Sequence, residues 1–126
     1  MISIVIPAYN EAGAIADTIA SVRGALAGSP EADAEILVVD DGSSDDTGRL
    51  AEQAGATLVR HPHNVGYGRA LKSGILAARH DTIAIIDADL TYPAEAIPTL
   101  AAEYRQGFDL VVGARTGHHY EGSVFK

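Results

Sequence analysis

Short apolar, β-branched runs alternate with longer stretches of helical spacing along the chain. Five runs have strand character: Ile2–Ile6, Glu35–Val39, Thr57–Arg60, Thr82–Ile86 and Asp109–Val112. Most of them are continuously apolar, which is typical of strands buried on both faces. Four intervening stretches carry apolar residues three and four positions apart: Ala12–Leu26, Asp46–Ala54, Gly66–Arg79 and Ala94–Tyr104. This order predicts an α/β fold, a mostly parallel sheet with helices on both faces.

Length and charge narrow the class of protein further. The 126 residues fit one domain, and the net charge of −8 argues against a nucleic-acid partner, which needs a basic face. No cysteine is present, so disulfides and thiolate metal sites are excluded. No apolar run approaches the ~20 residues that span a bilayer, and the start of the chain lacks the pattern of a signal peptide. We therefore expect a soluble, cytoplasmic chain.

Polar residues follow the predicted strands, and the carboxyl ends of parallel strands share one edge of the sheet, where ligands bind. The sharpest motif there is Asp87-Ala88-Asp89, at the end of an apolar strand. In an extended chain, residues two apart point to the same side, so both carboxylates would face one cavity. Two such carboxylates suit Mg²⁺ or Mn²⁺, with phosphate oxygens completing the shell. The alternative is a turn whose aspartates cap the next helix.

Other strand ends carry weaker signals. Asp40-Asp41 could accept hydrogen bonds from a base or a ribose, although the residues after them are typical of a turn and a helix cap. The Gly66-Tyr67-Gly68 segment, followed by Arg69 and Lys72, could approach a phosphate, or Asn64 and Gly66 could only form a turn. Arg115 could bind phosphate as a planar fork or lie at the surface.

The five histidines give little support to a metal site. His61 and His63 flank a proline, and His118 and His119 are adjacent, so neither pair has the helical spacing of metal ligands. Loop histidines are usually solvated, and we do not predict a zinc site from them.

Together these motifs resemble glycosyltransferase family 2, the inverting enzymes with the GT-A fold. The resemblance runs from Ile4 to Arg115 and rests on four motifs in order, which begin at Val5, Val38, Asn64 and Asp87. Within the family, the segments around Gly66, Asp87 and Val111 are most similar to dolichyl- and polyprenyl-phosphate mannosyl- and glucosyltransferases. In that subgroup a glutamine often stands at the position of Thr91, where it can help to hold the metal.

The resemblance implies a donor site for a UDP- or GDP-linked sugar. The residues it places at the nucleotide are Pro7, Ala8, Tyr9, Glu11, Asp40, Asp41, Lys72, Asp87 and Ala88. Asp87 and Asp89 would hold Mg²⁺ or Mn²⁺, and Asp89 and Arg115 would take part in catalysis. The reaction would transfer a hexose with inversion to a polyprenyl-phosphate lipid, at the inner face of the membrane in the full-length protein.

The implied organisation is a nucleotide-sugar-binding domain over residues 1–115, then a loop over 116–126 that begins a truncated acceptor region. Alternatives remain at this point. One is a nucleotide-sugar-binding module without turnover, and another is a transferase acting on a saccharide hydroxyl. A phospho-receiver fold would need its acidic pair after the first strand, and a nucleotidyltransferase would need a glycine-rich basic loop there. Pro7-Ala8-Tyr9-Asn10-Glu11 provides neither. The oligomeric state is not predicted.

Overall fold

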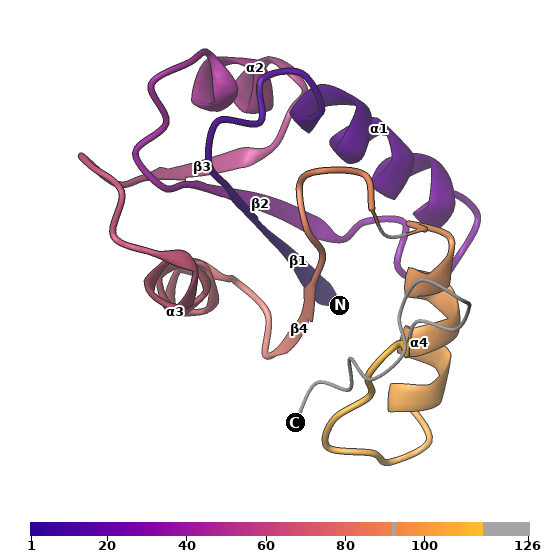
Figure 1. The fold of residues 1–126 in the computed structure, drawn as a ribbon. Helices are drawn as coiled ribbons and strands as arrows, with labels where there is room; N and C mark the ends of the chain where they lie inside the picture. The colour runs from indigo at the N-terminus through magenta and orange to yellow at the C-terminus, as the bar shows by residue number, and fades with distance from the viewer. Residues whose placement is uncertain (92, 115–126) are drawn as a thin grey trace.

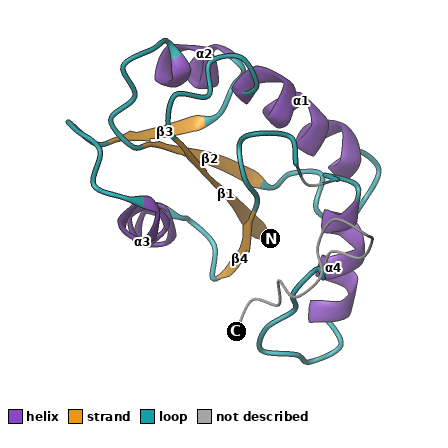
Figure 2. Cartoon of the chain, in the orientation of Figure 1, coloured by secondary structure: helices purple, strands orange, loops and turns teal. Residues whose placement is uncertain are grey.

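The computed structural model describes residues 1–91 and 93–114, which form an open α/β fold (Figures 1 and 2). The strands within this part are β1 (Ile2–Ala8), β2 (Glu35–Asp40), β3 (Thr57–Arg60) and β4 (Thr82–Ile85). They form one parallel sheet in the order β3-β2-β1-β4. The helices are α1 (Ile15–Leu26), α2 (Thr47–Gln53), α3 (Tyr67–Ala77) and α4 (Ala96–Tyr104). The predicted parallel sheet with helices on both faces is confirmed.

The central strands β1 and β2 are buried along their whole lengths, which explains their continuous apolar sequences. Alternate side chains enter two cores. Ile4, Ile6 and Val38 pack in the larger core with α1, whereas Val5 and Val39 face α3. Figure 1 shows α3 on the opposite side of the sheet from α1 and α2.

Helix α3 approaches the sheet closely through a glycine. A Cβ atom at Gly74 would lie 2.4 Å from Cγ1 of Val5 and 3.0 Å from Cγ2 of Val39. Only a residue without a side chain allows this separation, because interiors are already packed to the density of organic crystals. The glycine therefore sets how near α3 lies to β1 and β2.

The predicted fifth strand at Asp109–Val112 is wrong. These residues lie outside any ladder in the described part of the chain, and Leu110 and Val112 are exposed. A strand needs a neighbour to pair its backbone groups, and within the described residues β4 pairs only with β1. Strand β4 is accordingly an edge of the described sheet, with Ile85 exposed.

The strand order places a switch point between β1 and β4. From β1 the chain builds outward through β2 and β3, then crosses back to place β4 on the other side of β1. In open parallel sheets such a point leaves a crevice at the carboxyl ends of the strands. The loops after β1 and β4 are therefore the ones that meet there. Among the described helices, none is long and apolar enough to cross a membrane.

Candidate functional site

The loop after β4 is anchored at its middle residue. Ala88 is buried in the larger core, and its carbonyl accepts a 2.8 Å hydrogen bond from the hydroxyl of Thr18 on α1. Just before it, the backbone N–H of Ile86 donates to the carbonyl of Val5 at 3.2 Å. Asp87 and Asp89 thus lie on either side of a fixed point at the switch between β1 and β4.

This loop is a turn rather than an extended segment, which corrects the geometry expected from the sequence. Ala88 and Asp89 lie in the turn, and Leu90 has a φ of 63°, a left-handed value that costs a branched residue energy. Oδ1 of Asp89 accepts hydrogen bonds from the backbone N–H of Thr91 at 3.1 Å and from its hydroxyl at 2.6 Å. Asp89 therefore stabilises its own turn, whereas α4 begins only at Ala96.

A third carboxylate joins the two aspartates across the switch point. Burial, followed by the negative charges of Asp89, Asp45 and Asp87, raises the pKa of Glu11 above its ordinary value. Like charges shift a pKa in this way only at short range, so these carboxylates share one region. A cation bound there would relieve their repulsion.

The donor set fits a hard cation held jointly with a ligand. Asp87 and Asp89 offer carboxylate oxygens, which Mg²⁺ and Mn²⁺ prefer. Within residues 1–91 and 93–114, no three acidic or histidine side chains are arranged to hold a metal by themselves. Mg²⁺ is typically bound by one or two carboxylates together with substrate phosphates, and this chain offers that kind of incomplete shell.

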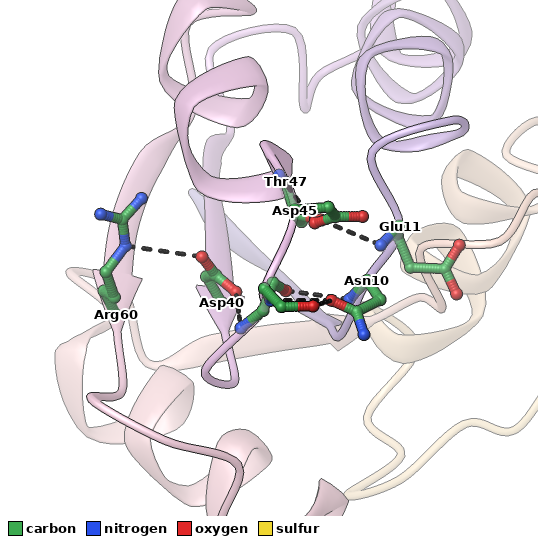
Figure 3. A network of polar contacts seen from close by, with 8 residues as sticks. Asn10, Glu11, Asp40, Asp45, Thr47 and Arg60 are labelled. Carbon is green, nitrogen blue, oxygen red and sulfur yellow. Dashed lines mark hydrogen bonds and ion pairs between the residues drawn. The ribbon is translucent and has the colours of Figure 1, made fainter.

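The loops after β1 and β2 are bonded to each other (Figure 3). Asn10 donates its backbone N–H to Oγ of Ser43 at 2.9 Å, and its side-chain oxygen accepts the N–H of Ser44 at 2.9 Å. The N–H of Glu11 donates to Oγ1 of Thr47 at 2.9 Å. Asn10 adopts a φ of 52°, a conformation that asparagine tolerates better than most residues. These bonds fix the backbone of Glu11 beside the start of α2.

Asp40 and Asp41 both lie at the end of β2, but their side chains point to different faces. The Asp40 carboxylate is buried, accepts the N–H of Ser43 at 3.0 Å and lies 3.5 Å from Nε of Arg60. Figure 3 shows this pair on the side of Asp40 away from Glu11. The Asp40 carboxylate thus stabilises the β2–α2 loop through Ser43 and contacts the end of β3 through Arg60.

Asp41 faces α3 and organises the loop between β3 and α3. Its Oδ1 accepts the N–H of Val65 at 3.0 Å and lies 2.8 Å from Nδ1 of His61, and its Oδ2 accepts the N–H of Gly66 at 3.0 Å. An ionised carboxylate has about four acceptor sites, so Oδ2 retains one for a further donor. Burial raises the pKa of Asp41, but these hydrogen bonds outweigh it and hold the pKa below its ordinary value.

Two residues of this region were missed by the sequence analysis. The hydroxyl of Tyr67, the first residue of α3, donates to Oδ1 of Asp87 at 3.2 Å. His61 is partly buried and bonded through both ring nitrogens, and not simply solvated. The Gly66-Tyr67-Gly68 motif indicated that the start of this helix could approach a phosphate. No local sequence pattern predicts that Tyr67 would contact the loop after β4.

The comparison with known families decides the class of protein. Residues 3–126 match the family described as Glycosyl transferase family 2. The chain belongs to glycosyltransferase family 2. Among curated relatives, an uncharacterized glycosyltransferase of Mycobacterium tuberculosis strain H37Rv is 38% identical over 114 residues, covering 90% of this chain and 48% of the relative. The undecaprenyl-phosphate 4-deoxy-4-formamido-L-arabinose transferase of Pseudomonas fluorescens is 36% identical over 130 residues, covering 98% of this chain and 37% of the relative.

Solved structures of family 2 enzymes share the fold. Glucosyl-3-phosphoglycerate synthase of Mycobacterium tuberculosis, in complex with Mn²⁺, UDP-glucose and phosphoglyceric acid, superposes with a TM-score of 0.71 at 31% identity. The match covers 85% of this chain and 40% of that enzyme. The family 2 chain therefore spans less than half the length of the relatives it matches.

The remaining predicted residues of the family 2 site have these positions. Pro7 and Ala8 are buried at the end of β1, and Tyr9 is exposed in the loop that follows. Lys72 is exposed on α3, between the sheet-facing residues Ala70 and Gly74. Arg115 and the loop 116–126 lie outside the described residues.

Proposed function

We propose that this chain forms the donor-binding part of an enzyme that transfers a hexose from a nucleotide-diphosphate sugar, with inversion, to a polyprenyl-phosphate lipid. The observation that carries the proposal is that Asp87 and Asp89 follow β4 at the switch point, where β4 pairs with the strand β1 that leads to Glu11. The loop bearing the two aspartates is fixed by the Thr18 hydroxyl. Membership of family 2 supplies the reaction class.

In the proposed donor site, Asp87 and Asp89 hold Mg²⁺ or Mn²⁺ against the diphosphate. The cation, when bound, stabilises the negative charge of the departing nucleoside diphosphate. Pro7, Ala8, Tyr9 and Glu11 would line the nucleoside pocket, and Oδ2 of Asp41 would accept a base or ribose donor at its remaining site. A relative with a TM-score of 0.71 holds Mn²⁺ and UDP-glucose, which supports this assignment.

The proposed acceptor is a lipid phosphate at the cytoplasmic face of the membrane. The support is the relative that is 36% identical over 98% of this chain and is named for transfer involving undecaprenyl phosphate. A phosphate oxygen is anionic near neutral pH, so attack on the anomeric carbon needs no protein base. Arg115 is proposed to bind this phosphate or the diphosphate, because a guanidinium matches two phosphate oxygens.

A second candidate is transfer to a hydroxyl acceptor. It is favoured by the solved family 2 structure that contains phosphoglyceric acid beside UDP-glucose. A hydroxyl must lose its proton as it attacks, so this reaction requires a carboxylate or histidine base within hydrogen-bonding reach. Binding of the donor without turnover is the third outcome that an experiment must separate.

The test begins with calorimetric titration of the 126-residue chain with UDP, GDP, UDP-glucose and GDP-mannose, with and without Mn²⁺. We expect binding of one nucleotide class that requires the metal. Release of nucleoside diphosphate is then measured with undecaprenyl phosphate in detergent and, separately, with a saccharide. Release only with the lipid supports the proposal, and release only with the saccharide supports the second candidate. Binding without release identifies a binding module, and absence of nucleotide binding refutes the donor site.

A further inference from the structure

A chain of side-chain hydrogen bonds runs from α3 to the end of β2. Oγ of Ser73 lies 2.8 Å from Nε2 of His61, and Nδ1 of His61 lies 2.8 Å from Oδ1 of Asp41. The Asp41 and His61 side chains are only 5% and 15% exposed, so water competes weakly for these bonds.

The direction of the chain follows from the charge of Asp41. Its pKa is depressed, because hydrogen bonds to the carboxylate outweigh burial, so Asp41 is an anion that only accepts. Nδ1 of His61 must therefore carry the proton that it donates. When the imidazole carries only that proton, Nε2 is an acceptor and the Ser73 hydroxyl donates to it.

Serine, histidine and aspartate in this order also form the triads of hydrolases, but this group lacks what a nucleophile needs. Ser73 lies inside α3, where backbone N–H groups are committed to the helix. An oxyanion hole requires donors that are free to meet the developing charge. Within the described residues, the network is better explained by what Asp41 holds.

Asp41 holds the loop that leads into α3. Its two oxygens accept the N–H groups of Val65 and Gly66, both at 3.0 Å. Gly66 has a φ of 106°, a conformation suited to glycine, and the next residue is Tyr67. At the other side, the loop packs against Gly42 so closely that a Cβ there would lie 2.2 Å from the carbonyl carbon of His63.

The 61–66 loop, held in this way, places the Tyr67 hydroxyl against the loop after β4 that bears Asp87. The hydroxyl lies 3.2 Å from Oδ1 of Asp87, although the Tyr67 side chain is otherwise exposed. Ordering an exposed side chain costs rotamer entropy, so this contact is favoured when the backbone that carries the side chain is already held. The backbone of Tyr67 is held by the bond from Gly66 to Asp41.

We propose that His61, oriented by Ser73, is a positioning residue of the donor site: through Asp41 it braces the 61–66 loop and so sets the Tyr67 hydroxyl against Asp87. The contact orients the Asp87 carboxylate and leaves its other oxygen for the cation. The part of this inference that concerns donor affinity rests on the proposed function. The part that concerns the placement of Tyr67 does not.

The ligand-independent test uses the Cζ resonance of Tyr67 in protein labelled with ¹³C-tyrosine, assigned with Tyr67→Phe. Asp87→Asn should shift this resonance in the wild-type background. In His61→Ala the same substitution should have little effect, because Tyr67 no longer meets Asp87. An equal shift in both backgrounds overturns the brace. Unfolding curves recorded in parallel show that each variant is folded at the temperature of measurement.

The ligand-dependent test is a double-mutant cycle on the Kd for UDP with saturating Mn²⁺. Tyr67→Phe and His61→Ala should each weaken binding about 3- to 10-fold, the range expected for one lost hydrogen bond. The double variant should bind no more weakly than the worse single variant, because both changes remove the same contact. Fold-changes that multiply overturn the proposal.

Two further variants separate positioning from general structural damage. His61→Asn keeps an amide donor near the position of Nδ1 and should recover part of the affinity lost in His61→Ala. His63→Ala, an exposed histidine in the same loop, should leave the Kd within about 2-fold of wild type. If wild type binds no nucleotide, the proposed function fails, and the tyrosine resonance still decides the brace.

Discussion

The hydroxyl of Thr18 on α1 donates a 2.8 Å hydrogen bond to the carbonyl of Ala88, between the two aspartates of the β4 loop. Both residues are buried, at 2% and 3% exposure, so no solvent can replace the bond. A single helix side chain therefore fixes the backbone from which Asp87 and Asp89 project.

Thr18→Val keeps the shape of this side chain and removes the donor. We expect a loss of about 1–3 kcal/mol in unfolding free energy, because the buried Ala88 carbonyl is left without its partner. Metal-dependent UDP affinity should fall as well. Urea unfolding and calorimetry measure the two effects. Thr99→Val, at an exposed position on α4, is the control and should change neither. Equal stability of Thr18→Val and wild type would contradict the anchoring role.

Asp89→Asn removes the charge but keeps an oxygen for the hydrogen bonds from Thr91. We expect the Mn²⁺-dependent part of UDP affinity to fall at least about 10-fold, since even residues that only support metal ligands contribute 10- to 100-fold. Stability should change little, because the turn is preserved. Calorimetry with and without Mn²⁺ makes the measurement, with Asp33→Asn, at an exposed position in the 27–34 loop, as the control. Unchanged metal dependence would refute the assignment of Asp89.

Gly42→Ala should destabilise the fold by at least about 2 kcal/mol, because its φ of 72° is strained for alanine. The added Cβ would also lie 2.2 Å from the backbone of His63. Thermal and urea unfolding test this. The matched control is Gly24→Ala, at an exposed position in the last turn of α1 with open space around its Cβ position. That change should raise stability by about 0.5–1 kcal/mol. Similar effects of both variants would be inconsistent with the close packing of the two loops.

Stability should depend on pH through Asp41. Its folded-state pKa lies below the unfolded value near 3.8, because hydrogen bonds from His61, Val65 and Gly66 outweigh the opposing effect of burial. The stabilising contribution is therefore complete above the unfolded pKa and is lost as pH falls through the folded pKa. Urea unfolding between about pH 3 and pH 7 should show wild type and Asp41→Asn converging as the solution becomes acidic. A stability difference that is constant across this range would argue against an ionised, bonded Asp41.

The sheet could be predicted from the sequence because strands buried on both faces are apolar at consecutive positions. Val5 and Ile6 face opposite cores, so the strand that contains them is apolar at consecutive positions. The position of the loops after β1 and β4 at one edge of the sheet also followed from parallel topology. The segment Asp109–Val112 has a similar apolar composition. A strand also needs a neighbouring strand to pair with, and the composition of a segment does not show whether such a neighbour is present.

The contacts between side chains that are distant in the sequence could not be predicted from sequence patterns. His61 and Ser73 meet because a loop and a helix pack on one face of the sheet, and no spacing rule links them. The positive φ of Leu90 could not be expected from a residue type that normally avoids it. Asp40 and Asp41 were treated as one pair, whereas the alternation of β2 sends their carboxylates to opposite faces.

The pairing of β1 with β4 joins the beginning of the chain to residues far along it, with Ile2 beside Thr82 and Val5 beside Ile85. Contacts between such distant positions form late, because the entropy of closing a long loop is lost before the contacts can stabilise the chain. The neighbouring pairing of β1 with β2 closes a much shorter loop, from Ser3 to Glu35. In refolding, the β1–β2–β3 unit with its helices should assemble first, and the ability to capture a nucleotide should emerge only in the final kinetic phase.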